Sequence, residues 1–209
     1  MSSRKDRFNR KDTFYMSLAL NLARQRKGLT GSNPSVGCVI VKNDKVISYG
    51  QTGITGYPHA EYNAIKNCKY NLKNSSLYVT LEPCSHYGKT PPCTNLIINS
   101  KIKKVYFSVN DTDIRSSEKA KKILNKKKIV VKRFLLKKHA LSFYKNYFYS
   151  KKKQLPYVVG KIACSKDKYI DVKNKIITSE QSRKVSHLLR YKNQGILISA
   201  KTLNLDNSK

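Results

Sequence analysis

Residues 80–93 read Thr-Leu-Glu-Pro-Cys-Ser-His-Tyr-Gly-Lys-Thr-Pro-Pro-Cys, and a His-Ala-Glu triplet precedes them at positions 59–61. One imidazole, at His59, and two thiols, at Cys84 and Cys93, are residue types that bind zinc. Three protein ligands leave the fourth tetrahedral position open for water, as a catalytic zinc requires. Glu61 is a poor fourth ligand but is well placed to carry protons. The spacing therefore predicts a catalytic zinc site.

The alternative for these residues is a structural zinc, which is usually closed by a fourth Cys or His ligand. No fourth ligand stands at the expected spacing, and His86 is the only spare candidate nearby. The pattern His-x-Glu followed by Pro-Cys is instead part of the signature of zinc deaminases. We therefore predict a hydrolytic deaminase in which Glu61 is the catalytic proton carrier.

The same stretch resembles the zinc loop of the deaminase half of the bifunctional riboflavin-biosynthesis deaminase/reductase family. Eight residues separate Cys84 from Cys93, whereas nucleobase and tRNA deaminases carry a compact Pro-Cys-x-x-Cys here. The sequence Ser-Asn-Pro-Ser-Val-Gly at 32–37 resembles the upstream substrate loop of that family. The resemblance runs from about residue 12 to the end, and it implies deamination of 2,5-diamino-6-(5-phosphoribosylamino)pyrimidin-4(3H)-one.

The resemblance also implies substrate contacts at Asn33, His86 and Lys89. The Asn33 amide can donate and accept, which suits a pyrimidinone edge. Lys89 suits a phosphate and His86 suits a hydroxyl. The alternatives are an Asn-Pro turn residue and a solvated loop. One departure affects the expected pocket: residues 111–117 read Asp-Thr-Asp-Ile-Arg-Ser-Ser, where the family has Asp-Pro-Asn-Pro and a Gly-rich segment.

Hydrophobic periodicity predicts an α/β protein in which helices and strands alternate. Asp12 is the expected cap of the first helix, and Asn43-Asp44 is the expected turn of an antiparallel hairpin. The expected helices cover 12–27, 59–68, 92–100, 116–125 and 137–149, and the expected strands cover 36–42, 45–49, 76–81, 104–109 and 129–134. Residues 1–150 are therefore predicted to form a cytidine-deaminase-like three-layer α/β/α domain with a mixed central sheet.

A linker is expected at 150–154, and residues 151–209 resemble the incomplete start of a reductase-like α/β domain. Strands are expected at 157–165 and 195–199 and a helix at 179–191. We expect a truncated product in which NADPH binds only if a complete reductase domain is supplied. Lys168 and Ile176 stand where the family has Gly and Trp. By resemblance, the NADPH positions are Ala163, Ile176, Thr202 and Asp206, and the substrate positions are Asn174 and Arg190.

The chain has 209 residues, of which 43 are Lys or Arg and 12 are Asp or Glu, giving a net charge of +31. Such a charge is typical of proteins that bind nucleic acids, but the lysines are spread along the whole chain. An RNA or nucleoside deaminase is thus an alternative, and a non-catalytic zinc-binding remnant is another. We expect a phosphorylated small-molecule substrate as partner, no nucleic acid, no membrane and a cytoplasmic location, with a homo-oligomer left open. Five cysteines fit no disulfide framework.

Overall fold

The structure is a computed structural model that describes residues 8–113, 115–170, 177–200 and 203–204. The chain divides into two compact units, Met1–Tyr157 (unit 1) and Val158–Lys209 (unit 2). No helix of the described part is long and apolar enough to cross a lipid bilayer.

Unit 1 is built on a mixed five-stranded sheet with the strand order β2-β1-β3-β4-β5. Its strands are β1 (Gly37–Lys42), β2 (Lys45–Gln51), β3 (Ser76–Val79), β4 (Lys104–Phe107) and β5 (Val130–Arg133). Strand β1 is antiparallel to both of its neighbours, whereas β3, β4 and β5 are parallel to one another. The expected mixed sheet is confirmed, and Asn43 and Asp44 form the hairpin turn with positive φ angles of 48° and 58°.

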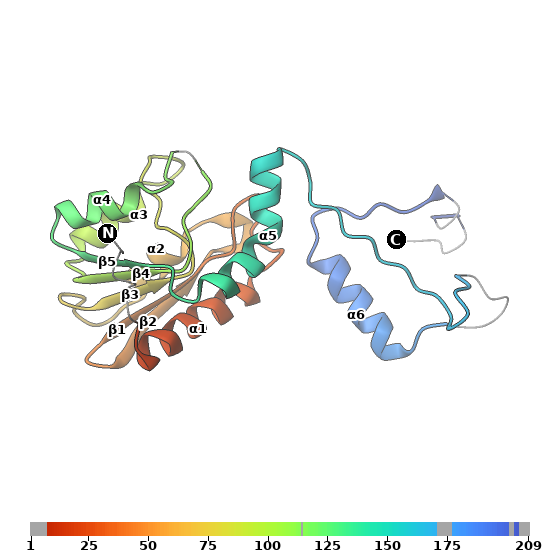
Figure 1. Cartoon of the computed structure of the whole chain (residues 1–209), viewed down its shortest axis with the longest axis horizontal. Coiled ribbons are helices and arrows are strands. Elements are labelled where there is room, and N and C mark those ends of the chain that lie inside the picture. The colour runs from red at the N-terminus through yellow and green to blue at the C-terminus, as the bar shows by residue number, and fades with distance from the viewer. Residues whose placement is uncertain (1–7, 114, 171–176, 201–202, 205–209) are drawn as a thin grey trace, which may run out of the picture. The chain divides into compact units, whose positions relative to one another are not determined.

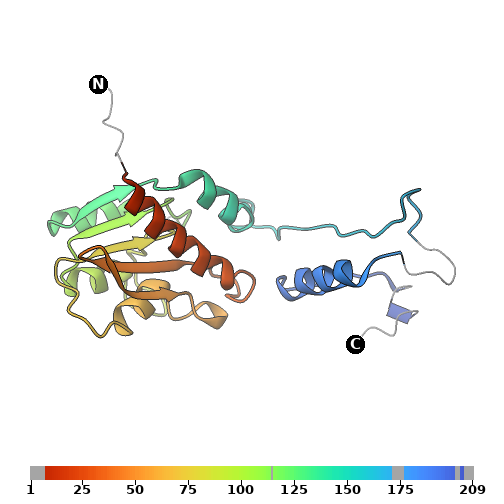
Figure 2. The same ribbon diagram turned by 90° about the horizontal axis from the view of Figure 1, so that it is seen from below.

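Helices cover both faces of this sheet and give the expected three layers. They are α1 (Arg10–Gln25), α2 (Ala60–Lys66), α3 (Cys93–Asn99), α4 (Lys119–Lys126) and α5 (Lys137–Lys153), with a short 3₁₀ turn η1 (Ile54–Gly56). Helix α1 lies across one face, and α2, α3 and α4 lie on the other (Figures 1 and 2). Alternate residues of each strand point to opposite faces. Accordingly, Val39 packs in the cluster with α1, and Ile40 packs in the cluster with α2, α3 and α4.

The start of α1 differs in detail from the prediction. Asn9, not Asp12, is the N-cap, and its side chain accepts a hydrogen bond from the Asp12 backbone N–H over 2.7 Å. Asp12 lies at the third helical position and accepts in return from the Asn9 backbone N–H over 3.2 Å. This reciprocal capping box satisfies two backbone donors that a helix start otherwise leaves without partners.

Helix α5 is anchored at the end of the sheet where β3 ends and β1 begins. The hydroxyl of Tyr144, which is 2% exposed, lies 2.6 Å from the Thr80 hydroxyl and donates to the Ser35 carbonyl over 3.0 Å. These hydrogen bonds join three segments that are far apart in sequence. They place the second half of α5 beside the loops that leave the sheet.

The expected linker at 150–154 differs from the structure, because α5 continues through most of it and ends at Lys153. Lysine has good helix propensity, and Lys151, Lys152 and Lys153 lie in the last turn, where cations interact favourably with the helix dipole. The division between the two units falls after Tyr157.

Unit 2 contains the expected helix, α6 (Glu180–Tyr191), with Ser179 as its N-cap. The predicted strands at 157–165 and 195–199 are wrong, because neither segment is a strand in the structure. Apolar side chains in both segments are exposed, including Ile162 at 75% and Leu197 at 98%. A strand needs a pairing partner to satisfy its backbone groups, and the described part of unit 2 supplies none.

Candidate active site

The site lies at the ends of β3 and β4, where two helices begin. His59 is the N-cap of α2, and Cys93 is the first residue of α3. Cys84 lies in the loop after β3, and its carbonyl accepts from the Thr94 backbone N–H over 3.1 Å. The carboxyl ends of parallel strands are the usual place for ligand sites in α/β sheets. The expected helices at 59–68 and 92–100 thus correspond to α2, whose N-cap is His59, and to α3, which begins at Cys93.

The structure brings the three predicted metal ligands together. The Nδ1 atom of His59 lies 3.6 Å from the Cys84 sulfur and 3.4 Å from the Cys93 sulfur. All three ligand atoms lie within 4.8 Å of one another. One nitrogen and two sulfurs at this separation fit a tetrahedral zinc, whose bonds to nitrogen and sulfur are about 2.0 to 2.3 Å long.

The pKa values of the two cysteine thiols also suit metal binding. Hydrogen bonds, first from the Cys93 side chain and then from His59, lower the pKa of Cys84. The hydrogen bond to the Cys84 sulfur, and then burial and repulsion from the charges of Glu61 and Cys84, raise the pKa of Cys93. One thiolate is therefore favoured by the protein itself. A bound cation would favour the second thiolate by removing the repulsion.

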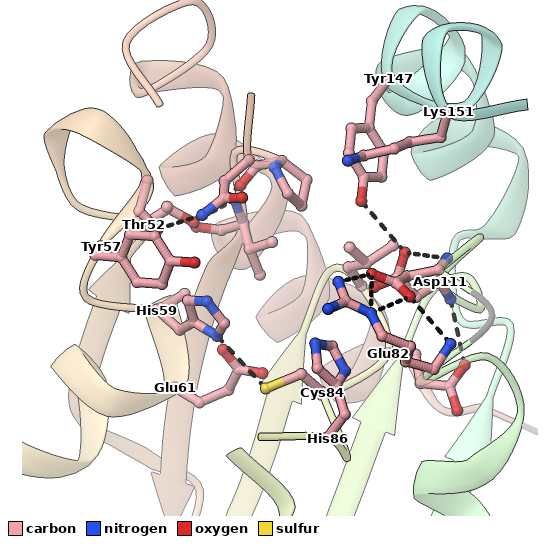
Figure 3. A pocket seen from close by; sticks show the side chains of 18 residues that line it. Thr52, Tyr57, His59, Glu61, Glu82, Cys84, His86, Asp111, Tyr147 and Lys151 are labelled. Carbon is pink, nitrogen blue, oxygen red and sulfur yellow. Dashed lines mark hydrogen bonds and ion pairs between the residues drawn. The ribbon is translucent and has the colours of Figure 1, made fainter. Parts of the chain in front are cut away.

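Glu61 lies in the first turn of α2 beside the three ligands and is 4% exposed. Burial raises its pKa to about 7, and the neighbouring His59 acts in the opposite direction. A carboxyl group with such a pKa can both accept and release a proton near neutral pH. Figure 3 shows the Glu61 carboxylate directed to the same place as the His59 ring and the Cys84 sulfur.

His59, Glu61 and Cys84 lie at one end of a pocket with a volume of about 120 Å³. The residues that line it come from the loop before β1, from the loops after β2, β3 and β4, from α2 and from α5 (Figure 3). They are Asn33, Pro34, Val36, Thr52, Gly56, Tyr57, His59, Ala60, Glu61, Leu81, Glu82, Cys84, His86, Asp111, Asp113, Arg115, Tyr147 and Lys151.

Of the three substrate contacts predicted within residues 1–150, Asn33 and His86 line the pocket. The amide nitrogen of Asn33 donates to the Gly56 carbonyl over 3.1 Å. The Nδ1 atom of His86 lies 2.6 Å from the Ser116 hydroxyl, which fixes the ring. Lys89 does not line the pocket, and its ammonium lies 5.6 Å from the centre of the Tyr57 ring. Tyr57 in turn stacks on His59, with the ring centres 5.4 Å apart.

The far wall of the pocket is formed by the loop that departs from the family pattern. Glu82, which is 3% exposed, accepts hydrogen bonds from the backbone N–H groups of Asp111, Glu118 and Ala120 at 3.0 to 3.2 Å. Burial raises the pKa of Asp111, and its carboxylate accepts from the Tyr147 hydroxyl over 3.4 Å. The altered loop is thus tied both to the zinc loop and to α5.

Sequence reasoning missed several pocket residues. Arg115 was noted only as a departure, and Thr52, Tyr57, Tyr147 and Lys151 gave no signal. Lys151 was assigned to a linker, so its position in the pocket follows only from the continuation of α5. No local motif could have found these residues, since they meet by tertiary packing.

Of the predicted reductase-type residues, the structure describes Ala163 and Arg190, both in unit 2. Ala163 is half-buried in a segment without regular structure, and Arg190 is exposed in the last turn of α6. The remaining predicted positions, Asn174, Ile176, Thr202 and Asp206, lie outside the described residues. Their predicted roles in NADPH or substrate binding stay predictions.

The fold and the His, Cys, Cys and Glu arrangement define the class of zinc-dependent deaminases with a cytidine-deaminase-like fold. Residues 9–109 match the family model described as the cytidine and deoxycytidylate deaminase zinc-binding region. The chain is 42% identical over 146 residues to a diaminohydroxyphosphoribosylamino-pyrimidine deaminase of Buchnera aphidicola, a match covering 70% of this chain and 99% of that relative. The chain therefore belongs to the deaminase family of riboflavin biosynthesis.

The similarity to longer relatives covers nearly the whole of this chain. The riboflavin biosynthesis protein RibD of Aquifex aeolicus is 38% identical over 198 residues, which is 93% of this chain and 56% of that protein. A solved deaminase/reductase of Thermotoga maritima is 34% identical with a TM-score of 0.86, covering 95% of this chain and 58% of that one. The chain spans about half the length of these relatives.

Proposed function

We propose that unit 1 removes the 2-amino group from 2,5-diamino-6-(5-phosphoribosylamino)pyrimidin-4(3H)-one by hydrolysis. The observation that carries this proposal is the convergence of His59, Cys84 and Cys93 on one point beside the buried carboxylate of Glu61. The match to a relative named for this deamination, which the chain covers almost completely, supports the choice of substrate.

Zinc held by the imidazole and the two thiolates would supply an activated water as nucleophile, because coordination lowers the pKa of water from about 15.7 to about 7. Glu61 takes a proton from the attacking water and delivers it to the ring nitrogen. It then takes the second proton from the hydroxyl group now on the ring carbon and passes it to the amine, which leaves as ammonia while the ring carbon keeps the oxygen as a carbonyl. One carboxylate can carry both protons because its raised pKa, about 7, lets it accept and release a proton near neutral pH.

The rest of the pocket holds and orients the pyrimidine. The Asn33 side chain presents an amide to the ring, and its position is set by the hydrogen bond to Gly56. A side chain on Gly56 would come within 2.7 Å of Asn33, and the φ angle there is +98°. Glycine at this position therefore allows Asn33 to approach the site. His86, which is held by Ser116, faces the sugar side of the substrate in this proposal.

The direct test is release of ammonia from the phosphoribosylated diaminopyrimidine by zinc-loaded protein. We expect turnover by the wild type and a loss of at least about a hundredfold in kcat for Glu61→Gln, since general acid–base catalysis contributes about 10² to 10⁴. The Glu61→Gln protein should still bind zinc, because the three ligands remain. Zinc-loaded wild-type protein without turnover on this substrate would disprove the proposal.

We further propose that unit 2 corresponds to the beginning of the reductase part of the longer relatives. The alignment of 198 residues with the Aquifex protein is longer than unit 1, so it extends into unit 2. We expect this chain alone not to bind NADPH, and a fluorescence titration with NADPH tests this. Saturable binding would show that this chain forms a nucleotide site and would contradict the expectation.

A further inference from the structure

Two cations line the wall of the pocket that faces the zinc-binding residues. Arg115 comes from the loop after β4, and Lys151 comes from the last turn of α5. In Figure 3, Lys151 lies across the pocket from His59 and Glu61, on the side of Asp111 and Tyr147. The zinc-binding residues and these two cations are therefore separated within one pocket.

Arg115 is held in place by Asp113. Its Nε atom lies 2.9 and 3.2 Å from the two carboxylate oxygens, and one of its terminal nitrogens also contacts Asp113. The Arg115 backbone N–H donates to the same carboxylate over 3.0 Å. A guanidinium group has five N–H donors, so this pairing orients Arg115 and leaves donors for an anion. The side chain is 62% exposed and accessible to one.

Lys151 supplies charge that Asp113 does not neutralise. Its ammonium lies 5.8 Å from the centre of the Tyr147 ring, a distance that allows a cation–π interaction. The Tyr147 hydroxyl is fixed in turn by Asp111. Lys151 has no salt bridge to any residue in the described part of the chain. The Arg115–Asp113 pair is neutral as a whole, and Lys151 adds a second cation to a wall that also carries the Asp111 carboxyl group.

We infer that Arg115 and Lys151 bind the phosphate group of the substrate and make the enzyme select phosphorylated over unphosphorylated pyrimidines. This inference rests on the proposed function and adds specificity residues that the sequence pattern did not assign. Arginine presents paired donors to phosphate oxygens, and lysine acts as a point charge. Arg115 stands where the family has a Gly-rich segment, so this contact belongs to this chain's own loop.

The test compares two substrates, the phosphoribosylated diaminopyrimidine and the same molecule without its phosphate. We expect Arg115→Gln and Lys151→Gln each to raise KM for the phosphorylated substrate by about tenfold, as loss of one charge-assisted hydrogen bond would. We expect kcat on the phosphorylated substrate, and kcat/KM on the unphosphorylated one, to stay within about twofold. This combination, a higher KM for the phosphorylated substrate and unchanged kinetics on the unphosphorylated one, is expected if the two cations contact only the phosphate.

Arg10→Gln and Lys152→Gln are the matched controls, since both residues are exposed and neither lines the pocket. They remove the same charge and should leave KM unchanged. The inference would be overturned by an equal loss of kcat/KM on both substrates, by no loss of kcat/KM on either, or by the same loss in the control variants.

A binding measurement keeps the inference testable if no deamination is observed. Ribose 5-phosphate is the probe, and its dissociation constant is measured by calorimetry with the wild type and the four variants. We expect about tenfold weaker binding for Arg115→Gln and for Lys151→Gln, and unchanged binding for the controls. Wild-type protein that does not bind ribose 5-phosphate would refute the phosphate site, whereas binding without turnover would refute only the proposed reaction.

Discussion

The backbone N–H of Cys93 donates a hydrogen bond to the sulfur of Cys84 over 3.2 Å. The start of α3 thus stabilises a thiolate on the preceding loop while its own first residue supplies the second sulfur. A helix N-terminus has free N–H groups and positive potential, and both favour a thiolate. This relationship links the folding of α3 to the formation of the metal site.

Replacing either cysteine should therefore remove zinc. We expect Cys84→Ala and Cys93→Ala to reduce bound zinc from about one ion per chain to near none, because two remaining ligands bind zinc weakly. Deaminase activity should disappear with the metal. The zinc content is measured by mass spectrometry after exhaustive dialysis.

Cys164→Ala is the matched control, since this cysteine is exposed and lies in unit 2. It should keep full zinc content. If the Cys84 and Cys93 variants retained zinc at the level of this control, the three-ligand site would be wrong.

Gly50 allows β2 to approach α2, the helix that carries Glu61. A Cβ atom at position 50 would lie 2.4 Å from both the Ala60 carbonyl oxygen and the Ala64 backbone nitrogen. We expect Gly50→Ala to lower the free energy of unfolding by about 1 to 3 kcal/mol, as overpacking does, and to weaken zinc binding by displacing α2. Chemical denaturation and a competitive zinc titration measure the two effects.

Gly88→Ala is the comparison within unit 1, because its added Cβ would meet only the His86 ring at an ordinary 3.8 Å. Its free energy of unfolding should match that of the wild type. Equal stability of the two alanine variants would contradict the close approach at Gly50.

The Tyr144 hydroxyl should contribute to the stability of unit 1. We expect Tyr144→Phe to lower the free energy of unfolding by about 1 to 3 kcal/mol, because the change leaves the buried Ser35 carbonyl without its donor. Tyr149→Phe, at a site that is 41% exposed, should change it little. Thermal or urea unfolding measures the free energy of unfolding of both variants. An unchanged value for Tyr144→Phe would contradict the prediction and would mean that water replaces the hydroxyl.

The Arg115 guanidinium lowers the pKa of Asp113 from 3.8 to about 2. A carboxyl group whose pKa is lower in the folded state stabilises the fold above its unfolded pKa, and this contribution is lost as the pH falls. The wild type should thus exceed Asp113→Asn in stability by at most about 1 kcal/mol at pH 6, because the pair is partly exposed. The difference should shrink between pH 4 and pH 2. Denaturation at several pH values measures it, and a difference that grew on acidification would have the wrong sign.

Local sequence was sufficient to predict most of unit 1. The alternation of apolar residues placed its five strands and five α-helices nearly where the structure has them, because burial on a sheet or a helix imposes a period that short windows reveal. It failed for 157–165 and 195–199, where apolar runs are present but the residues that the structure describes in unit 2 offer no strand to pair with. It also missed the continuation of α5 through the lysine-rich end, since a run of exposed lysines fits a helix and a linker equally well.

The sequence by itself determined the chemistry of the site: the ligand types, their spacing and the glutamate next to the histidine specify a zinc deaminase before any folding is considered. Tertiary structure alone decided what surrounds that chemistry. The far wall is assembled from Asp111, Arg115, Tyr147 and Lys151, which come from two separate segments of the chain. They meet only because Glu82 and Tyr144 tie the loop and the helix to the end of the sheet. Such long-range contacts depend on the packing of whole elements, which no local pattern encodes.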